Sequence, residues 1–299
     1  MHRLVWRYRT MKNPFFSGVC TALVTPFLDG KVNYPMAKAL LSRQIDAGIK
    51  AVVIAGTTGE SPTLTDHEKI ELFRQCKEFA GDKCTVIAGT GSNSTAHAVH
   101  LSIQAEQAGA DGLLVVSPYY NKATPDGLLA HYLAVAHSVS IPVIVYNVPS
   151  RTGVDIPVSV YKRLSNVPNI AGVKEASTDL TKVSKIKNAC GPNFAVWSGN
   201  DDLTVPVMAL GGAGVISVAS NVCPEEMVAM TQAAINEDYE SASNMQHTLQ
   251  PLIDLLFCEV NPIPVKAAMN YIGYDCGTCR LPLCSPSKDC ELKLKSYFS

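Results

Sequence analysis

The chain has 299 residues, of which 47% are hydrophobic and 17% charged, and its formal net charge is −1. Near-neutral charge without basic runs argues against nucleic acid or an anionic membrane surface as a partner, and no apolar stretch approaches the roughly 20 residues that span a bilayer. We therefore predict a cytoplasmic protein that acts on small molecules, with no nucleic-acid or membrane partner; the length suits one large α/β barrel or two ordinary domains.

The N-terminal tip differs from the rest of the chain. The first ten residues are basic and are interrupted by arginines, so they lack the continuous apolar segment of a secretory signal. A second methionine, Met11, directly precedes the globular pattern. We predict that residues 1–16 form an N-terminal extension, disordered in part; a start of translation at Met11 is the alternative.

Short β-branched runs alternate with amphipathic segments, and each strand-plus-helix unit takes ~20–33 residues. Eight such units predict a (β/α)8 TIM barrel over residues 17–223. A doubly wound open sheet is the competitor, but no G-x-G-x-x-G follows a strand. The predicted strands are residues 19–24, 51–55, 85–88, 112–116, 143–146, 170–174, 194–197 and 214–218. The predicted helices of the barrel are residues 35–47, 66–79, 95–108, 125–138, 157–164, 180–189 and 203–210. Helical patterns at 225–235, 239–257 and 264–271 predict a C-terminal helical region over residues 224–299.

The second predicted strand leads into the turn Gly56-Thr-Thr-Gly-Glu. Its glycines flank Thr57 and Thr58 and present hydroxyl and backbone N–H groups, which can hold a carboxylate without a metal. Catalytic groups of a barrel lie at the C-terminal ends of its strands, where this turn is expected. The alternative is an ordinary threonine turn that caps the next helix.

Two later strands end in tyrosines. Tyr119 and Tyr120 follow the fourth strand and point in different directions, so one can face the barrel mouth and the other a neighbouring surface; interface packing is the alternative. Tyr146 ends the fifth strand, and its hydroxyl can relay protons. Arg151 on the following loop can bind a carboxylate through two hydrogen bonds. A buried core phenol and a surface salt bridge are the alternatives for these two residues.

The sixth predicted strand is strongly apolar apart from Lys174. A buried ammonium is costly, so such a lysine has a carboxylate partner or loses its proton. A neutral lysine amine is a good nucleophile toward carbonyls and can form a Schiff base. The alternative is a lysine that reaches solvent at a strand end and pairs with Glu175.

The seventh and eighth strands end near glycines, which let backbone carbonyls approach a small ligand closely. Gly199 is therefore a candidate substrate-binding residue. Together, the strand ends place a nucleophilic lysine, a proton-relaying tyrosine, a hydroxyl-rich turn and an arginine around one mouth. This set predicts a class I aldolase acting on a 2-oxo acid, in which an imine acidifies the neighbouring methyl group and the enamine attacks an aldehyde. Such chemistry requires no cofactor.

Ten cysteines raise the possibility of disulfides or zinc. Most lie in periodic apolar segments, where cysteine behaves as a small hydrophobe. The tail residues Cys276, Cys279, Cys284 and Cys290 are spaced more like metal ligands, but only one pair is C-x-x-C and prolines interrupt the rest. We predict reduced thiols and no metal site, with a zinc site as the alternative.

Four segments closely resemble the dihydrodipicolinate synthase family of pyruvate-dependent aldolases, from about residue 17 to residue 283. They are residues 56–60, 146–153, 172–176 and 261–266. The resemblance implies a TIM barrel with a C-terminal helical domain, assembled as a homotetramer of tight dimers or as a homodimer. It also implies that the substrates are pyruvate and L-aspartate 4-semialdehyde, the product being 4-hydroxy-tetrahydrodipicolinate on the route to diaminopimelate and lysine.

The resemblance also implies the roles of the site residues. Lys174 would form the Schiff base with pyruvate and Tyr146 would be the general acid and base. Thr57 and Tyr120 would complete the proton relay, with Tyr120 supplied by the adjacent subunit. The substrate-binding residues would be Thr58 and the backbone of Ile216 for pyruvate, and Arg151 for the carboxylate of the aldehyde.

Relatives with the same lysine and tyrosine act on other aldehydes, namely N-acetylneuraminate lyase and keto-deoxy sugar-acid aldolases. Arg151 and the paired threonines favour the dihydrodipicolinate branch, because a charged aldehyde needs an arginine more than a polyhydroxylated one does. A barrel that only senses an oxoacid is the remaining alternative.

One segment departs from the lysine-inhibited members of the family. Those members carry a histidine-rich segment after the Gly-Glu-Ser turn, and a glutamate one helical turn beyond the asparagine that matches Asn93. Here these places hold Asp66 and Lys69, and His97. The acidic group for the effector is missing and Lys69 adds a repelling charge, so we predict weak or absent feedback by lysine.

Overall fold

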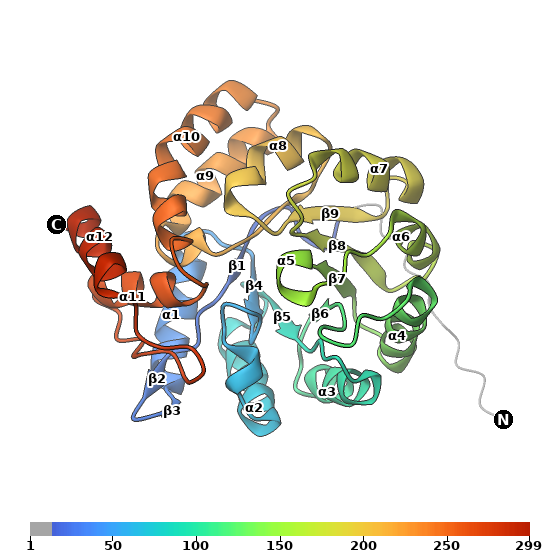
Figure 1. The fold of residues 1–299 in the computed structure, drawn as a ribbon, viewed down its shortest axis with the longest axis horizontal. Helices are drawn as coiled ribbons and strands as arrows, with labels where there is room; N and C mark the ends of the chain where they lie inside the picture. The colour runs from blue at the N-terminus through green and yellow to red at the C-terminus, as the bar shows by residue number, and fades with distance from the viewer. Residues whose placement is uncertain (1–13) are drawn as a thin grey trace.

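The apolar runs form the eight parallel strands of a closed barrel, shown with its helices in Figure 1, in a computed structural model that describes residues 14–299. The order around the barrel is β1-β10-β9-β8-β7-β6-β5-β4, so neighbours in sequence are neighbours in the barrel, with β1 closing against β10. The predicted (β/α)8 fold is confirmed. The barrel strands are β1 (Gly18–Ala22), β4 (Ala51–Ile54), β5 (Thr85–Gly89), β6 (Gly112–Val116), β7 (Val143–Asn147), β8 (Ile170–Glu175), β9 (Ala195–Ser198) and β10 (Gly214–Ser217).

Helices surround the barrel, and their apolar faces pack on the outer faces of the strands to form the larger of two hydrophobic cores. Five of the seven barrel helices begin at a residue whose side chain caps them. Thr65, for example, accepts from the Glu68 N–H, and the Glu68 carboxylate accepts from the Thr65 N–H at 2.9 Å. The barrel helices are α1 (Tyr34–Asp46), α2 (Asp66–Ala80), α3 (Thr95–Gln107), α4 (Pro125–Ser138), α6 (Val158–Leu164), α7 (Leu180–Cys190) and α8 (Thr204–Ala209).

The second, smaller core fills the barrel interior, and aromatic residues close the barrel at the N-terminal ends of its strands. Phe16, immediately before β1, stacks on Trp197 with ring centroids 4.7 Å apart, and the Trp197 indole N–H donates to the Phe16 carbonyl at 3.2 Å. Phe15 lies against Gly112, where an added Cβ would be only 2.6 Å from its ring. These two residues belong to the predicted N-terminal extension, of which residues 1–13 lie outside the described residues.

The C-terminal helical region is present and lies to one side of the barrel (Figure 1). Its boundary at residue 224 stays a prediction. Several short elements were not predicted, among them α5, the three 3-10 turns, the β2–β3 hairpin and the last helix. The elements outside the barrel wall are α9 (Pro224–Ile235), α10 (Tyr239–Leu256), α11 (Ile263–Tyr271), α12 (Lys288–Phe298), α5 (Pro149–Thr152), β2 (Phe27–Leu28), β3 (Lys31–Val32), η1 (Ser61–Thr63), η2 (Asp201–Leu203) and η3 (Ala219–Asn221).

Over residues 14–299, none of the helices combines the length and the apolar character needed to cross a bilayer.

Candidate active site

A cavity of about 180 Å³ opens at the C-terminal ends of the strands. It is built from the turn after β4, the ends of β7 and β8, the loop after β9 and the segment between α10 and α11. This is the end of a barrel where side chains from several strands converge. The polar residues that line it are Thr57, Thr58, Tyr146, Ser150, Arg151, Lys174, Asn200 and Asn261.

Lys174 and Tyr146 face each other at the centre of this cavity. They are direct partners in the register of β7 and β8, and the Lys174 Nζ lies 4.5 Å from the centroid of the Tyr146 ring. Both side chains are buried, with 5% and 6% of their surface exposed. Within the described part of the chain, no carboxylate lies within 4.0 Å of the Lys174 Nζ. The amine thus meets the cavity without an ion-pair partner.

Glu175, the neighbour of Lys174 in sequence, has partners of its own on the opposite face of β8. Its carboxylate lies 3.5 Å from the Lys182 Nζ and accepts from the Asn147 amide at 2.7 Å and the Tyr161 hydroxyl at 3.2 Å. Burial, together with the charge and the hydrogen bond of Glu175, raises the pKa of Tyr161 well above its usual value. The alternative in which Lys174 pairs with Glu175 is therefore wrong, because successive strand residues point to opposite faces.

The threonine turn and Arg151 are joined by a residue far away in sequence. Asn261 donates from its amide to the Thr58 hydroxyl oxygen at 3.1 Å, and its backbone carbonyl accepts from the Arg151 guanidinium at 3.1 Å. Thr58 is buried, Thr57 is half-buried and Arg151 is exposed on the short helix α5, which lies over the barrel mouth in Figure 1. Hydroxyl, amide and guanidinium donors therefore surround the space in front of Lys174.

The other predicted residues are placed differently. Gly199 lines the cavity, and a Cβ there would meet the Ala176 Cβ at 2.5 Å, so the close approach of these two loops requires glycine. Ile216 is fully buried in the barrel interior and does not line the cavity. Tyr120 also lies outside the cavity, with 89% of its surface exposed and a positive φ of 73°. The structure thus brings together all the predicted residues except Ile216 and Tyr120.

A neighbouring cavity of about 250 Å³ shares Thr57, Tyr146 and Arg151 with the first. Its far wall includes Lys69 and His97. The His97 ring lies 2.8 Å from the Asp66 carboxylate, and the Lys69 Nζ lies 4.0 Å from it. Burial lowers the pKa of Lys69, and the charge of Asp66 opposes that shift. Asp66, the single carboxylate among these three side chains, is therefore already next to two basic side chains.

A buried ion pair between Glu60 and Lys266 supports the threonine turn, and neither residue was predicted to have a role in the site. Glu60 at the end of the turn accepts from the Lys266 ammonium at 2.7 Å and from the backbone N–H of Arg280 at 2.8 Å. Burial lowers the pKa of Lys266, and the hydrogen bond to Glu60 opposes this. Arg280 also pairs with Glu68 at 2.6 Å, and this hydrogen bond lowers the pKa of Glu68 to about 2.

Asn261 and Lys266 were missed for a common reason. Both belong to the segment 261–266, which carries part of the family resemblance, and this resemblance is the one sequence feature that could have indicated a role for them. Their partners Thr58 and Glu60 are 203 and 206 residues away, so nothing in the local pattern indicates which groups they meet.

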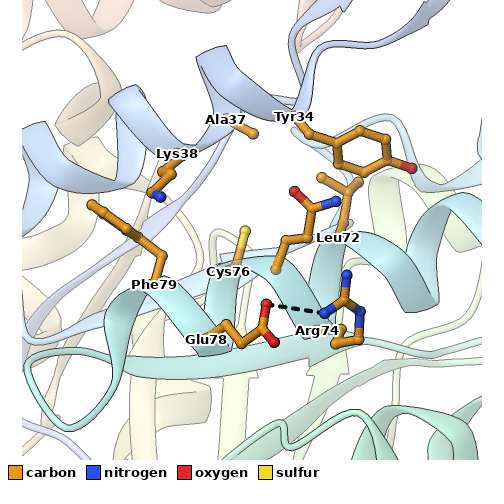
Figure 2. Close-up of a pocket in the computed structure, with 9 residues that line it drawn as sticks. Tyr34, Ala37, Lys38, Leu72, Arg74, Cys76, Glu78 and Phe79 are labelled. Atoms are coloured by element: carbon orange, nitrogen blue, oxygen red, sulfur yellow. Dashed lines mark hydrogen bonds and ion pairs between the residues drawn. The ribbon is translucent and has the colours of Figure 1, made fainter.

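A third cavity, of about 310 Å³, lies between α1 and α2 on the outside of the barrel (Figure 2). Arg74 pairs with Glu71 at 2.6 Å and with Glu78 at 3.0 Å, and the Lys38 ammonium lies 4.8 Å from the centroid of the Phe79 ring. None of the predicted site residues lines this cavity, so we assign the chemistry to the barrel mouth.

All ten cysteines are free thiols in the structure. Among residues 14–299, no three histidine, cysteine, aspartate or glutamate side chains gather closely enough to hold a metal ion.

The chain is similar to known proteins over nearly its whole length. Residues 15–299 match the dihydrodipicolinate synthetase family. The 4-hydroxy-tetrahydrodipicolinate synthase of Thermoanaerobacter sp. (strain X514) is 47% identical over 287 residues, which cover 96% of this chain and 97% of the relative.

Two solved structures extend this similarity to the fold. The chloride-inhibited dihydrodipicolinate synthase of Acinetobacter baumannii, complexed with pyruvate, is 39% identical with a TM-score of 0.92, covering 94% of this chain and 97% of the other. The Cyanidioschyzon merolae enzyme with lysine bound is 42% identical with a TM-score of 0.92, covering 95% and 97%.

Proposed function

The chain belongs to the dihydrodipicolinate synthetase family, lyases of lysine and diaminopimelate biosynthesis, and from this premise we propose that it condenses pyruvate with L-aspartate 4-semialdehyde to give 4-hydroxy-tetrahydrodipicolinate. One observation carries the proposal. Lys174 is buried in the barrel mouth beside Tyr146 without an ion-pair partner, and polar donors surround the space in front of it. A carboxylate beside the amine would hold its proton, whereas a free amine can attack a carbonyl.

The reaction follows from this arrangement. The Lys174 amine adds to the C2 carbonyl of pyruvate, water leaves, and an imine forms. The imine withdraws electrons from the adjacent methyl group, which loses a proton through the Tyr146 hydroxyl to give an enamine. The enamine carbon attacks the aldehyde, and the amino group of the second substrate then displaces Lys174 and closes the ring. The lysine itself supplies the electron sink, so the chemistry needs no cofactor.

The donors around the amine divide between the two substrates. Thr58, with the backbone at Ile216 and Gly199, would hold the pyruvate carboxylate. Arg151, at the rim on α5, would hold the carboxylate of the aldehyde, because a guanidinium matches that group in shape and charge. The Acinetobacter baumannii relative is known in complex with pyruvate, which supports pyruvate as the first substrate.

The proton relay is proposed to include a second subunit. Thr57 and Tyr146 line both cavities, whereas Tyr120 lines neither and is exposed. An exposed tyrosine at a positive φ is well placed to enter the site of a neighbouring chain. We therefore propose self-association as a homotetramer or a homodimer, with Tyr120 completing the partner's relay.

Feedback by lysine is proposed to be weak or absent. Asp66 is already paired with His97 and Lys69, so no free carboxylate is left in this group for the amino group of an effector. The Cyanidioschyzon merolae relative is known with lysine bound, and the proposal expects this chain to differ from it. Initial rates with and without lysine test the proposal, and inhibition at submillimolar lysine would contradict it.

The central experiment supplies pyruvate with L-aspartate 4-semialdehyde and measures product formation. In parallel, borohydride reduction in the presence of pyruvate, followed by peptide mass analysis, locates the adduct. We expect turnover and a reduced pyruvate adduct on Lys174. The alternative activity, cleavage of N-acetylneuraminate or of a keto-deoxy sugar acid, is assayed with the same protein.

The outcomes separate the candidate functions. Cleavage of only the sugar acid would move the chain to another branch of the aldolases. An adduct without turnover of either substrate would indicate a barrel that senses an oxoacid. An adduct on a side chain other than Lys174 would refute the site.

A further inference from the structure

Two cysteine thiols meet in the C-terminal region, and neither cysteine lines the active-site cavity. Cys258 follows α10 and Cys290 lies in the first turn of α12. The Cys258 thiol donates to the Cys290 sulfur, with 3.5 Å between the two sulfur atoms. Cys258 is exposed, whereas Cys290 is 1% exposed and packs in the hydrophobic core. One thiol is therefore open to a small reagent and the other is shielded behind it.

Cys258 belongs to a strap, residues 257–261, that connects α10 to α11 and forms part of the barrel mouth. The first and last residues of the strap, Phe257 and Asn261, both line the active-site cavity. Asn261 also contacts Thr58 and Arg151. A covalent bond at Cys258 would therefore restrain a segment that touches substrate-binding groups.

The start of α12 already rests on this strap. The Ser287 backbone N–H lies 3.3 Å from the Glu259 carboxylate, and the Ser287 hydroxyl caps α12 by accepting from the Cys290 N–H at 3.2 Å. These contacts hold the two segments next to each other before any covalent bond forms. The sulfurs have to approach by only roughly 1.5 Å to reach the ~2.05 Å length of a disulfide.

We propose that Cys258 and Cys290 are a modification site at which a low-molecular-weight disulfide, such as glutathione disulfide, installs a reversible intrachain disulfide. The Cys258 thiolate attacks a glutathione sulfur, and one glutathione thiolate leaves. The Cys290 thiolate then attacks the Cys258 sulfur and releases the second glutathione. Two protein thiols are oxidised, one glutathione disulfide is reduced to two thiols, and the two thiol protons of the protein pass to the glutathione thiolates.

The environments of the two thiols fix the order of these steps. Burial and the neighbouring Cys258 thiol raise the pKa of Cys290 to about 12, so Cys290 is a poor first nucleophile. Once Cys258 carries glutathione, its proximity to Cys290 makes the second step intramolecular. An exposed disulfide in a cytosolic-type protein belongs to the reducible class rather than to the permanently oxidised one.

The test uses the full chain, reduced and then incubated with glutathione disulfide. Free thiols are alkylated under denaturing conditions, and protease digestion with mass analysis maps the linked cysteines. We expect loss of two thiols, a peptide linking Cys258 to Cys290, a higher melting temperature of the oxidised protein, and full reversal by dithiothreitol. None of these readouts depends on the proposed enzymatic activity.

Three variants sharpen the test. In Cys258→Ser no crosslink should form, and in Cys290→Ser glutathione should remain attached to Cys258. Cys284→Ser, at another exposed cysteine of the same region, is the matched control and should crosslink like the wild type. If Cys290→Ser fails to fold, the Cys258→Ser result and the wild-type map still decide. Stable glutathionylation of Cys258 in the wild type, or a link that excludes Cys290, would overturn the proposal.

Discussion

Two buried lysines have different surroundings: Lys174 lies at the barrel mouth, and Lys266 lies behind the threonine turn. Lys266 is 1% exposed; its ammonium donates to Glu60 at 2.7 Å and to the Thr278 carbonyl at 3.1 Å, and it lies 3.9 Å from the centroid of the Phe27 ring. Lys174 is 5% exposed and lies over the face of Tyr146, and no carboxylate in residues 14–299 pairs with it. Burial is therefore common to both lysines, and the presence of a carboxylate separates them.

The difference indicates how to recognise a reactive amine in a barrel. A carboxylate neighbour stabilises the charged form and fixes its direction, which suits a structural role. Lys182, paired with Glu175 and Asp155, follows the pattern of Lys266. Lys174 lacks such a partner because its strand directs it into the barrel, whereas Glu175 points outward to the helices.

The largest expected effect is on catalysis at Lys174. In Lys174→Met we expect kcat to fall by on the order of 10⁴-fold or more, because the covalent route is lost while the apolar stem is kept. Steady-state kinetics and borohydride trapping check this, and the variant should form no pyruvate adduct. Circular dichroism should match the wild type. Substantial residual turnover with an unchanged fold would show that Lys174 is not the reactive amine.

The next effect is on stability at Lys266. Removal of one partner of a buried ion pair leaves an uncompensated charge, so Lys266→Met should lower the free energy of unfolding by about 3–5 kcal/mol. Urea denaturation measures it, with Lys174→Met as the matched control, which should change stability by less than about 1 kcal/mol. The double variant Lys266→Met with Glu60→Gln should recover part of the loss. Equal destabilisation by both lysine variants would show that the two sites do not differ.

A smaller effect on kcat distinguishes the two proposed steps at Lys174, formation of the imine and its conversion to the enamine. Tyr146→Phe removes the proposed proton carrier but not the amine, so kcat should fall by about 10²–10³-fold while pyruvate still forms a trappable adduct. Tyr161→Phe is the control, because this buried tyrosine bonds Glu175 outside the cavity. Its kcat should stay within a few-fold of the wild type. A Tyr146→Phe protein with normal turnover would remove Tyr146 from the mechanism.

The smallest effect is a pH dependence of the C-terminal contact. The pKa of Glu68 is lowered from 4.5 to about 2 by the hydrogen bond from Arg280, so the folded state favours the carboxylate. The stability from this pair is complete above pH 4.5 and is lost as pH falls toward 2. Melting temperatures between these values should therefore fall more steeply for the wild type than for Glu68→Gln.

A surface pair provides the control for this measurement. Arg74 also lowers the pKa of Glu71 to about 2, but the pair lies on the exposed face of α2. Salt screens exposed charges. High salt should therefore remove the effect of Glu71→Gln and leave more of the effect of Glu68→Gln. Identical salt dependence would place Glu68 among ordinary surface pairs.

Much of the fold and of the mouth was predictable because it follows local rules. Apolar runs at regular spacing predict the eight strands. Because the C-terminal ends of barrel strands meet at one mouth, the sequence also predicts that Lys174, Tyr146, Thr57 and Thr58 lie together. The helix α5 has four residues, fewer than a periodic pattern needs. In α12, only Cys290 and Leu294 are buried, and two apolar positions four residues apart are too few to predict a helix.

The remaining features depend on long-range partners. Asn261 and Lys266 meet Thr58 and Glu60, which lie more than 200 residues earlier in the chain. The outward direction of Glu175 follows from strand geometry, but its partners Tyr161 and Lys182 come from separate helices. Sequence reasoning therefore placed the reactive groups and did not identify the contacts that hold them.

The contacts of Glu60 and Thr58 with the far end of the chain have a consequence for biosynthesis on the ribosome. The turn that bears Thr57 and Thr58 is made early, but its supports Asn261, Lys266 and Arg280 are translated more than 200 residues later. The barrel itself cannot close until β10 meets β1. A nascent chain therefore has no finished reaction centre until these three residues have left the ribosome.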